Sequence, residues 1–410
     1  MALSWFHDAL LADPESPALA PGSLLVEDGF VRGVFGPDLP PPEDAFAIAL
    51  GGRTLAPGFL DLHYHGRLIF CAPAVAPAEL SAASRRLVAH GVTGFLPTTV
   101  AWPSDRLMTQ VSAWAAACDA GHGAAGAAIL GVHLEGPWIR PEAAGAQPRA
   151  GIRPYDADEG RELFDRAEGR VRMVTFAPEA DGAAGLLAEL VRRGIVPSLG
   201  HSHAPAEDAQ AAIDAGARHV THLFNAMGGL HHRTLGLAGV ALTDDRLTCD
   251  LICDGVHVDP AVMRLAARAK ANRLCLITDN VEPGDPGDDA PDDAAGAPAD
   301  TGLGAGDVRD DGTVLRLADG TLAGSNLTLD RAVRNAIAFG AMSGLEAIRA
   351  VTLRPAEVLG LASEVGTFRP GARADLVVLD GEGRVVETRI AGEVAYRASA
   401  DRASGHGTSG

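Results

Sequence analysis

The middle of the chain alternates short apolar runs with longer amphipathic segments. Between the runs, residues such as 77–91 and 205–216 carry apolar positions at helical spacing, and several segments open with Pro and close with Gly, as helices do. Alternating strands and helices are typical of parallel βα units. The eight apolar runs are FLDLHYH (59–65), GFLPTT (94–99), ILGVHLE (129–135), VRMVTFA (171–177), IVPSLGH (195–201), HVTHLF (219–224), LTCDLIC (247–253) and RLCLITD (273–279). The pattern predicts the α/β class, with eight βα units closing a (β/α)8 TIM barrel.

The two ends of the chain follow a different pattern. Residues 22–35 and 373–397 each combine short apolar strands with Gly-containing turns. Both stretches are rich in residues that favour β-structure and contain no helical periodicity. We therefore expect one small β-sandwich domain built from both termini, residues 1–56 and 360–398, beside a barrel that spans residues 57–359.

Two further stretches fit no regular element. Residues 283–312 are rich in Pro, Gly, Ala and Asp, and we interpret them as a mobile acidic insertion after the eighth strand. Residues 399–410 are rich in Ser and Gly and predict a disordered tail. If the insertion folds over a site, its aspartates would repel an anionic ligand, whereas an insertion that points to solvent has no such effect.

Composition and charge narrow the class of protein. The 410 residues suit a barrel of ~250 residues with a smaller second domain. Hydrophobic residues make up 47%, yet no apolar run reaches the ~20 residues that span a bilayer, and the first residues lack the features of a signal peptide. A net charge of −19 argues against a nucleic-acid partner, and five scattered cysteines fit reduced thiols. We therefore expect a cytoplasmic protein that binds neither nucleic acid nor membrane.

Histidines and acids gather where the apolar runs end, which is where active sites of this barrel lie. They are His63, His65, Glu135, His201, His222 and Asp279. Because side chains alternate along a strand, His63 and His65 point the same way and can bind one ion. Imidazole and carboxylate together suit zinc, iron or manganese. The sequence therefore predicts a divalent metal site, with zinc expected and one or two ions left open.

Other polar residues near these strand ends allow structural roles. His203 and His219 lie close to the fifth and sixth runs, and we interpret both as surface or loop residues, with contact to the metal ligands as the alternative. Asp250 and Asp254 flank the seventh run, and we expect structural roles for them. The single lysine, Lys270, lies before the eighth run, so a carbamylated lysine cannot bridge two metals here and a Schiff base is excluded.

The motifs around the candidate ligands resemble the amidohydrolase superfamily and, within it, the N-acetylglucosamine-6-phosphate deacetylase family. PGFLDLHYHG is similar to the HxH signature of strand one, which many hydrolases share. The more specific motifs are GVHLEGPW (131–138), LGHSHA (199–204), THLFNAM (221–227), DGVHVDP (254–260), LITD (276–279) and LAGSNLT (322–328). The resemblance covers nearly the whole chain. It implies hydrolysis of the N-acetyl group of an amino sugar 6-phosphate, to give acetate and the amino sugar phosphate.

The resemblance also assigns roles to the metal ligands. It implies that Glu135, His201 and His222 hold the principal ion, and that His63 and His65 make room for a second. Without a lysine on the fourth run, any bridge between two ions must be Glu135. A metal ion lowers the pKa of a water molecule and polarises the amide carbonyl, which makes an otherwise inert amide open to attack.

The remaining roles concern proton transfer and substrate binding. The resemblance implies that Asp279 is the general base and then the general acid, since a free amine leaves more easily than an amide anion. It implies that Asn225, the Ala226 backbone, Arg233 and His257 hold the sugar phosphate. It also implies a homodimer in which the partner subunit finishes the phosphate site.

Three departures from the family pattern bear on the substrate. The family has a histidine after Lys-Gly-Ala/Thr to orient the substrate carbonyl, whereas here Gln147 stands there and can donate a hydrogen bond without being cationic. The loop around Arg233 keeps the arginine but changes its neighbours, and Asn280 follows Asp279 where the family has Ala. Two alternatives therefore stay open: an amidohydrolase acting on an unphosphorylated N-acyl sugar or another N-acyl amide, and a non-catalytic scaffold.

Overall fold

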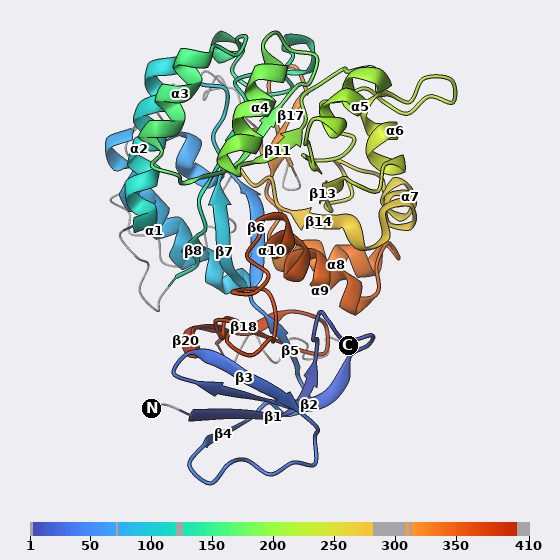
Figure 1. Ribbon diagram of the computed structural model, residues 1–410. Coiled ribbons are helices and arrows are strands. Elements are labelled where there is room, and N and C mark those ends of the chain that lie inside the picture. Colours follow the sequence, from blue (N-terminus) through green and yellow to red (C-terminus); the bar gives the residue numbers. More distant parts are fainter. Residues whose placement is uncertain (1–2, 71–72, 120–125, 282–308, 311–313, 400–410) are drawn as a thin grey trace.

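The chain folds into two parts that lie one above the other in Figure 1. The computed structural model describes residues 3–70, 73–119, 126–281, 309–310 and 314–399. The larger part is a mixed α/β fold, and the smaller part is a β-sheet to which both ends of the chain contribute. Most of the predicted acidic insertion and nearly all of the predicted tail lie outside the described residues.

Parallel strands form the centre of the α/β part. They hydrogen-bond in two sheets, β6-β7-β8 and β9 through β14 in chain order. All eight predicted apolar runs contain one of these strands. The bounds are β6 (Phe59–Tyr64), β7 (Val92–Pro97), β8 (Ala128–Ile129), β9 (Val132–Glu135), β10 (Val171–Phe176), β11 (Val196–Leu199), β12 (His219–Val220), β13 (Thr248–Ile252) and β14 (Leu274–Ile277).

The third apolar run is where the two sheets divide. Gly131, with a φ of 140°, interrupts the run, so β8 pairs with β7 and β9 pairs with β10. Backbone bridges then connect the sheets at both edges, from Thr98 to His133 and from Tyr64 to Asn280. The strands therefore curl towards one another and bring their carboxyl ends to the same side.

Helices cover the outside of the parallel strands (Figure 1). Local signals explain several ends: Asp156 caps α3, Asp259 caps α7 ahead of Pro260, and Gly194 ends α4 in the left-handed region. The α-helices are α1 (Ala76–Leu87), α2 (Ser104–Asp119), α3 (Ala157–Arg166), α4 (Ala183–Arg193), α5 (Ala206–Asp214), α6 (Gly236–Thr243), α7 (Pro260–Lys270), α8 (Leu329–Ala338), α9 (Gly344–Val351) and α10 (Leu353–Val358). The short 3₁₀ helices are η1 (Gly66–Phe70), η2 (Pro73–Val75), η3 (Val88–His90), η4 (Pro141–Ala143), η5 (Arg149–Gly151) and η6 (Ala271–Arg273).

Strands from both ends of the chain pair in one sheet below the α/β part. Its order is β20-β19-β18-β5-β1-β2-β3, with β4 also paired to β1. Strand β5 joins the two ends because it runs parallel to β1 and antiparallel to β18. Phe6, Leu24, Leu55 and Val378 pack in its core. The strands are β1 (Leu3–Leu11), β2 (Ala20–Glu27), β3 (Phe30–Phe35), β4 (Phe46–Ala49), β5 (Thr54–Pro57), β18 (Leu376–Leu379), β19 (Val385–Ile390) and β20 (Glu393–Arg397).

A fourth sheet, which is antiparallel, lies beside the carboxyl end of β14. It contains β15 (Arg309–Asp310), β16 (Val314–Arg316) and β17 (Leu322–Ser325), none of which the sequence pattern predicted. Ser325 forms a bridge with Asn280, and its amide donates to the carbonyl of Asp279. The turn before β17 is thereby held next to the end of the eighth parallel strand.

Two further predictions concern the whole chain. Within the part that the structure describes, no helix is both long and apolar enough to cross a membrane. The described cysteines, Cys118, Cys249, Cys253 and Cys275, are free, and burial raises the pKa of the Cys249 thiol to about 12. Such a thiol stays protonated near neutral pH, which fits a packing role rather than a reactive one.

Candidate active site

The six predicted metal-site and acid–base residues meet at one place, at the carboxyl ends of the parallel strands. They form two groups, and within each group the potential ligand atoms all lie within 4.8 Å of one another. The first group is His63, His65 and Asp279, and the second is Glu135, His201 and His222. All but His63 line a cavity of about 250 Å³, while His63 lies fully buried beneath it. The cavity is large enough for a small organic ligand.

Glu135 joins the two groups through its two carboxylate oxygens. Its Oε1 lies 3.0 Å from His201 Nε2 and 2.9 Å from His222 Nε2. Its Oε2 lies 3.2 Å from His65 Nε2 and 3.5 Å from His63 Nε2. Asp279 Oδ1 lies 3.3 Å from His65 Nε2 on the other side. The carboxylate therefore faces one pair of imidazoles with each oxygen, which is the arrangement of a bridging ligand.

Backbone geometry turns three of these side chains into the cavity. His201, His222 and Asp279 each lie two residues past the end of a strand, and their φ angles are 46°, 33° and 47°. Residues other than Gly adopt this left-handed region at a cost of about 1–3 kcal/mol and do so mainly at functional sites. The fold accepts the same strain after β11, β12 and β14, and it thereby turns the three side chains into one cavity.

Hydrogen bonds at the Nδ1 atoms of two histidine rings, which point away from Glu135, show that the site suits a cation. His65 Nδ1 donates to the Thr98 carbonyl at 3.0 Å, and His201 Nδ1 donates to the Ala143 carbonyl at 2.8 Å. A carbonyl oxygen only accepts, so the proton of each neutral ring is on Nδ1 and the lone pair on Nε2 faces Glu135. Lone pairs and a carboxylate at about 3 Å repel unless a proton or a metal ion lies between them. The residues present therefore fit a divalent metal.

Without a metal ion, the carboxylates of this cluster raise the pKa values of His65 and His222. Burial lowers the pKa of His65, but Asp279 and Glu135 outweigh it and raise that pKa to about 10. Burial raises the pKa of Asp279, but His63 and His65 outweigh it and lower that pKa to about 2. The same opposition, with His63 and His201 as the positive groups, holds the pKa of Glu135 well below its usual value. A bound cation takes the place of these protons, so metal uptake releases them.

Several residues of the cavity wall come from elements that the sequence pattern did not predict. Thr321, Leu322, Ala323 and Gly324, from the turn before β17 and from β17 itself, line the cavity. Apolar side chains also line it, namely Ile69 from η1 and Val100 and Val281 from two loops. For Leu322, Ala323 and Gly324, the only signal in the sequence was the LAGSNLT motif. The position of these residues depends on how β17 packs beside β14.

The predicted substrate-binding residues divide into two sets. Asn225, Ala226 and His257 line the cavity, and Ala226 has a φ of 50°. Gln147 also lines it, but its amide is bonded to Glu135 Oε2 at 2.5 Å and to the Ala101 amide at 2.7 Å. Arg233 is exposed, in a turn closed by the bridge from His231 to Thr234, and it does not line the cavity of its own chain.

Two expectations about secondary residues change. His219, which we interpreted as a surface or loop residue, is fully buried; its Nε2 lies 2.9 Å from Asp250 Oδ1 and its Nδ1 bonds Thr248 Oγ1 at 2.6 Å. The surface interpretation was wrong because His219 begins β12, whose neighbours on both sides cover it. Asp254 bonds His257 Nδ1 at 2.5 Å and therefore sets the orientation of a cavity residue.

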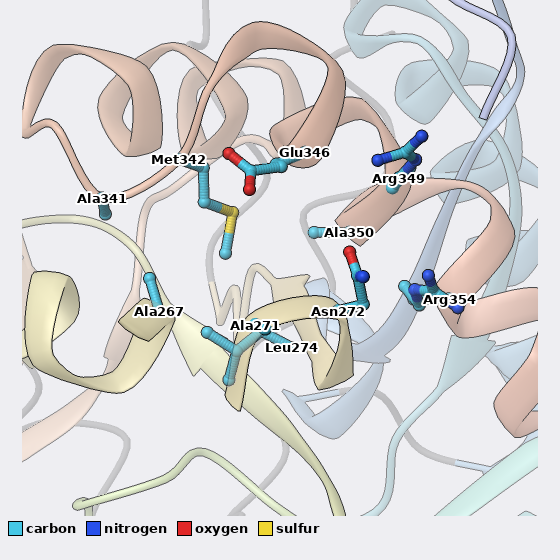
Figure 2. Close-up of a pocket in the computed structure, with 10 residues that line it drawn as sticks. All are labelled: Ala267, Ala271, Asn272, Leu274, Ala341, Met342, Glu346, Arg349, Ala350 and Arg354. Carbon is cyan, nitrogen blue, oxygen red and sulfur yellow. The ribbon is translucent and has the colours of Figure 1, made fainter. Parts of the chain in front are cut away.

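A second, smaller hollow lies far from these groups (Figure 2). It is found at the amino-terminal end of β14, between α7, η6 and α9, and Figure 2 shows Met342 and Glu346 facing Ala271 and Asn272 across it. Its volume is about 20 Å³, enough for roughly one water molecule. No group of potential metal ligands among the described residues lies there. The larger cavity over Glu135 is therefore the candidate active site.

Comparison with known proteins agrees with this site. The model of the amidohydrolase family matches residues 54–400, so the chain belongs to this metal-dependent family. The chain is 37% identical to human N-acetylglucosamine-6-phosphate deacetylase over 404 residues, covering 93% of this chain and 94% of the relative. It is 36% identical to N-acetylgalactosamine-6-phosphate deacetylase of Escherichia coli O157:H7 over 344 residues, covering 84% of this chain and 88% of the relative.

Solved structures give the same result. N-acetylglucosamine-6-phosphate deacetylase from Thermotoga maritima matches with a TM-score of 0.80 at 32% identity, covering 96% of this chain and 100% of that one. The enzyme of that name from Pasteurella multocida matches with a TM-score of 0.83 at 26% identity, covering 96% and 99%. The resemblance to the deacetylases that the sequence motifs predicted is confirmed.

Proposed function

We propose that this chain removes the N-acetyl group from an amino sugar 6-phosphate, converting N-acetylglucosamine-6-phosphate to glucosamine-6-phosphate and acetate. The observation that carries the proposal is the convergence of two ligand groups, joined by Glu135, on the floor of one cavity. Relatives at 32–37% identity over most of the chain bear the deacetylase name. A metal site in a cavity of this size fits hydrolysis of a small amide.

The cofactor we propose is a divalent metal, zinc first, with iron or manganese as alternatives. Glu135, His201 and His222 would hold one ion, and His63 and His65 a second, with Glu135 between them. When bound, the metal polarises the acetyl carbonyl and lowers the pKa of water. Imidazole and carboxylate ligands are the set that zinc takes at catalytic sites.

Asp279 is the residue that we propose moves the proton. Its carboxylate lines the cavity with Oδ1 3.3 Å from His65 Nε2, so it would lie beside a bound ion, where a carboxylate can accept a proton from the attacking water. As the water oxygen bonds to the acetyl carbon, the C–N bond breaks and Asp279 passes that proton to the departing nitrogen. The sugar leaves as an amine and the acyl group leaves as acetic acid, which gives its remaining proton to the amine. The products are therefore acetate and an ammonium group, and both atoms and charge balance.

The rest of the cavity would hold the sugar phosphate. Asp254 keeps the Nδ1 proton of His257 engaged, which leaves Nε2 for a ligand. Asn225 and the backbone of Ala226 lie beside His222 on the same wall. Arg233 lies outside the cavity of its own chain, so we propose that it reaches the phosphate of a partner subunit in a homodimer.

Exposed apolar side chains support that dimer. Leu230 and Leu235 flank Arg233 in sequence and are 52% and 38% exposed. Large apolar side chains on both sides of an arginine are typical of a surface that another chain covers. We further propose that the two parallel sheets close into one eight-stranded barrel, that the terminal sheet folds as a two-layer sandwich, and that the protein works in the cytoplasm.

A substrate screen tests the proposal directly. Purified protein is incubated with the 6-phosphates of N-acetylglucosamine and N-acetylgalactosamine and with both unphosphorylated sugars, and the released acetate is measured. Both epimers are included because one relative is named for the galactosamine substrate. We expect turnover of a phosphorylated sugar with kcat/KM at least about tenfold above its unphosphorylated form. Equal turnover of the unphosphorylated sugar would instead favour the alternative amidohydrolase.

Arg233→Ala separates phosphate binding from the chemistry. We expect a rise in KM of about tenfold or more for the phosphosugar with little change in kcat, because an arginine–phosphate contact contributes to binding in both ground and transition states. Arg161→Ala is the matched control, since Arg161 is an exposed arginine that forms an ion pair with Asp158. An unchanged KM in Arg233→Ala would count against the phosphosugar.

Metal content tests the enzyme class itself. Protein purified without chelator should carry at least one divalent ion per chain, because two groups of ligands face each other at the cavity floor. A content below about 0.2 equivalents, without recovery of activity on adding zinc, would favour a non-catalytic scaffold.

A further inference from the structure

The amide of Gln147 is bonded at both ends within the protein. Its Oε1 accepts the Ala101 N–H at 2.7 Å, and its Nε2 donates to Glu135 Oε2 at 2.5 Å. The reverse orientation would set an NH2 group against an N–H and an oxygen against a carboxylate, so these partners determine which end is which. Gln147 is only 8% exposed, and at least one Nε2 hydrogen serves Glu135 rather than a substrate carbonyl.

Gln147 contacts only one of the two Glu135 oxygens. Oε1 has His201 and His222 as partners, whereas Oε2 faces His63 and His65. Within the described chain, the Gln147 amide is the donor found on Oε2 besides the two imidazoles. Gln147 therefore holds the Glu135 oxygen that faces His63 and His65, and it does not contact the oxygen that faces His201 and His222.

We propose that Gln147 is a positioning residue that holds Glu135 as a bridge and thereby controls binding of a second divalent ion at His63 and His65. The inference rests on the proposed metal-dependent function. A free glutamate rotates about its terminal torsion, and a single ion at His201 and His222 can take both of its oxygens. The bond from Gln147 disfavours that rotation and keeps Oε2 turned towards the second group. Hydrogen-bond partners of metal ligands typically change metal affinity by about 10–100-fold.

Gln147→Met tests the idea at nearly constant side-chain volume. Methionine cannot donate to Oε2, so we expect zinc affinity of the His63–His65 group to fall on the order of 10–100-fold. The other group should keep its affinity. Chelator-stripped protein is titrated with Zn²⁺ alone by calorimetry, and bound zinc is counted after gel filtration. Arg149→Ala is the matched control, since Arg149 is exposed on the same loop and its bonded partner is the Pro141 carbonyl; it should bind zinc as the wild type does.

The outcomes separate this inference from the proposed function. Two ions in the wild type and one in Gln147→Met, under zinc that saturates the wild type, support the positioning role. Two ions in the variant with affinities within about threefold of wild type, loss of both ions, or a wild type that binds only one ion would each overturn it. If the wild type binds one ion and still deacetylates, only this inference fails. If Gln147→Met does not fold, Gln147→Ala provides the same comparison.

Discussion

Replacing Thr175 with valine should destabilise the folded protein more than removing the Ser198 hydroxyl at the far end of the same series of hydrogen bonds, which lies beneath the metal site. His133 Nδ1 donates to the Leu62 carbonyl at 3.0 Å, so its Nε2 must accept, and Thr175 Oγ1 is its donor at 2.8 Å. Burial and His63 hold the pKa of His133 well below its usual value, which keeps the ring neutral and able to accept. Because the His133 proton is on Nδ1, the direction of each hydrogen bond in the series that begins at Thr175 is determined.

Two more hydroxyls, those of Thr221 and Ser198, complete this series of hydrogen bonds. Thr175 Oγ1 lies 2.6 Å from Thr221 Oγ1, which lies 2.5 Å from Ser198 Oγ. Since Thr175 donates to His133, Thr221 must donate to Thr175 and Ser198 to Thr221. All four side chains are fully buried, so water cannot replace a lost partner without entering the core.

The magnitude follows from what each substitution leaves unpaired. Thr175→Val keeps the shape of the side chain but leaves the His133 Nε2 without a donor and the hydroxyl hydrogen of Thr221 without an acceptor. At about 1–3 kcal/mol for each buried unsatisfied group, we expect a loss of about 2–4 kcal/mol. Ser198→Ala removes only the last hydroxyl of the series and leaves no donor without an acceptor. It should cost about 1 kcal/mol or less.

Urea unfolding of chelator-treated protein, followed by circular dichroism, measures both variants without a contribution from metal. A fall in the midpoint at constant m reports the change in stability. Equal losses for Ser198→Ala and Thr175→Val would refute the bond directions, and a loss below about 1 kcal/mol for Thr175→Val would refute the claim that the bonds matter. The His133 ring also packs edge-on against His63, with centroids 4.8 Å apart, so weaker zinc binding should accompany the loss.

Two more predictions concern charged pairs. Asp254→Asn should lower kcat/KM for the phosphosugar about tenfold, because the carboxylate that fixes the Nδ1–H tautomer of His257 is lost; steady-state kinetics measure this, and an unchanged kcat/KM would contradict it. Asp330→Asn should cost about 2–4 kcal/mol at pH 7, since Asp330 bonds His90 and Arg334. Burial raises the pKa of Asp330, but His90 and then Arg334 outweigh it and hold the pKa well below 3.8, so the wild-type advantage should be constant from pH 5 to 7 and shrink as the pH falls below about 4. Unfolding curves across pH check this, and an advantage that persists undiminished at pH 2 would contradict it.

Local sequence determined the parallel strands and the residues that carry the chemistry. Periodicity of two placed His63 and His65 on one face of β6, and the apolar runs located each strand end to within a few residues. Strand-end chemistry depends on short-range features, namely alternation, the carboxyl ends of parallel strands and residue type. The sequence therefore allowed the candidate ligands to be named before the fold was known.

The tertiary structure decided how those residues meet. Which Glu135 oxygen faces which pair of histidines depends on strands separated by more than 60 residues of chain. The bond from Gln147 to Oε2 depends on how the segment after β9 folds back over Glu135. The same holds for the burial of His219 beside Asp250, which local polarity did not predict. Pairing partners distant in sequence leave no periodic signal in either segment, because each hydrogen bond is decided by packing that only the folded chain provides.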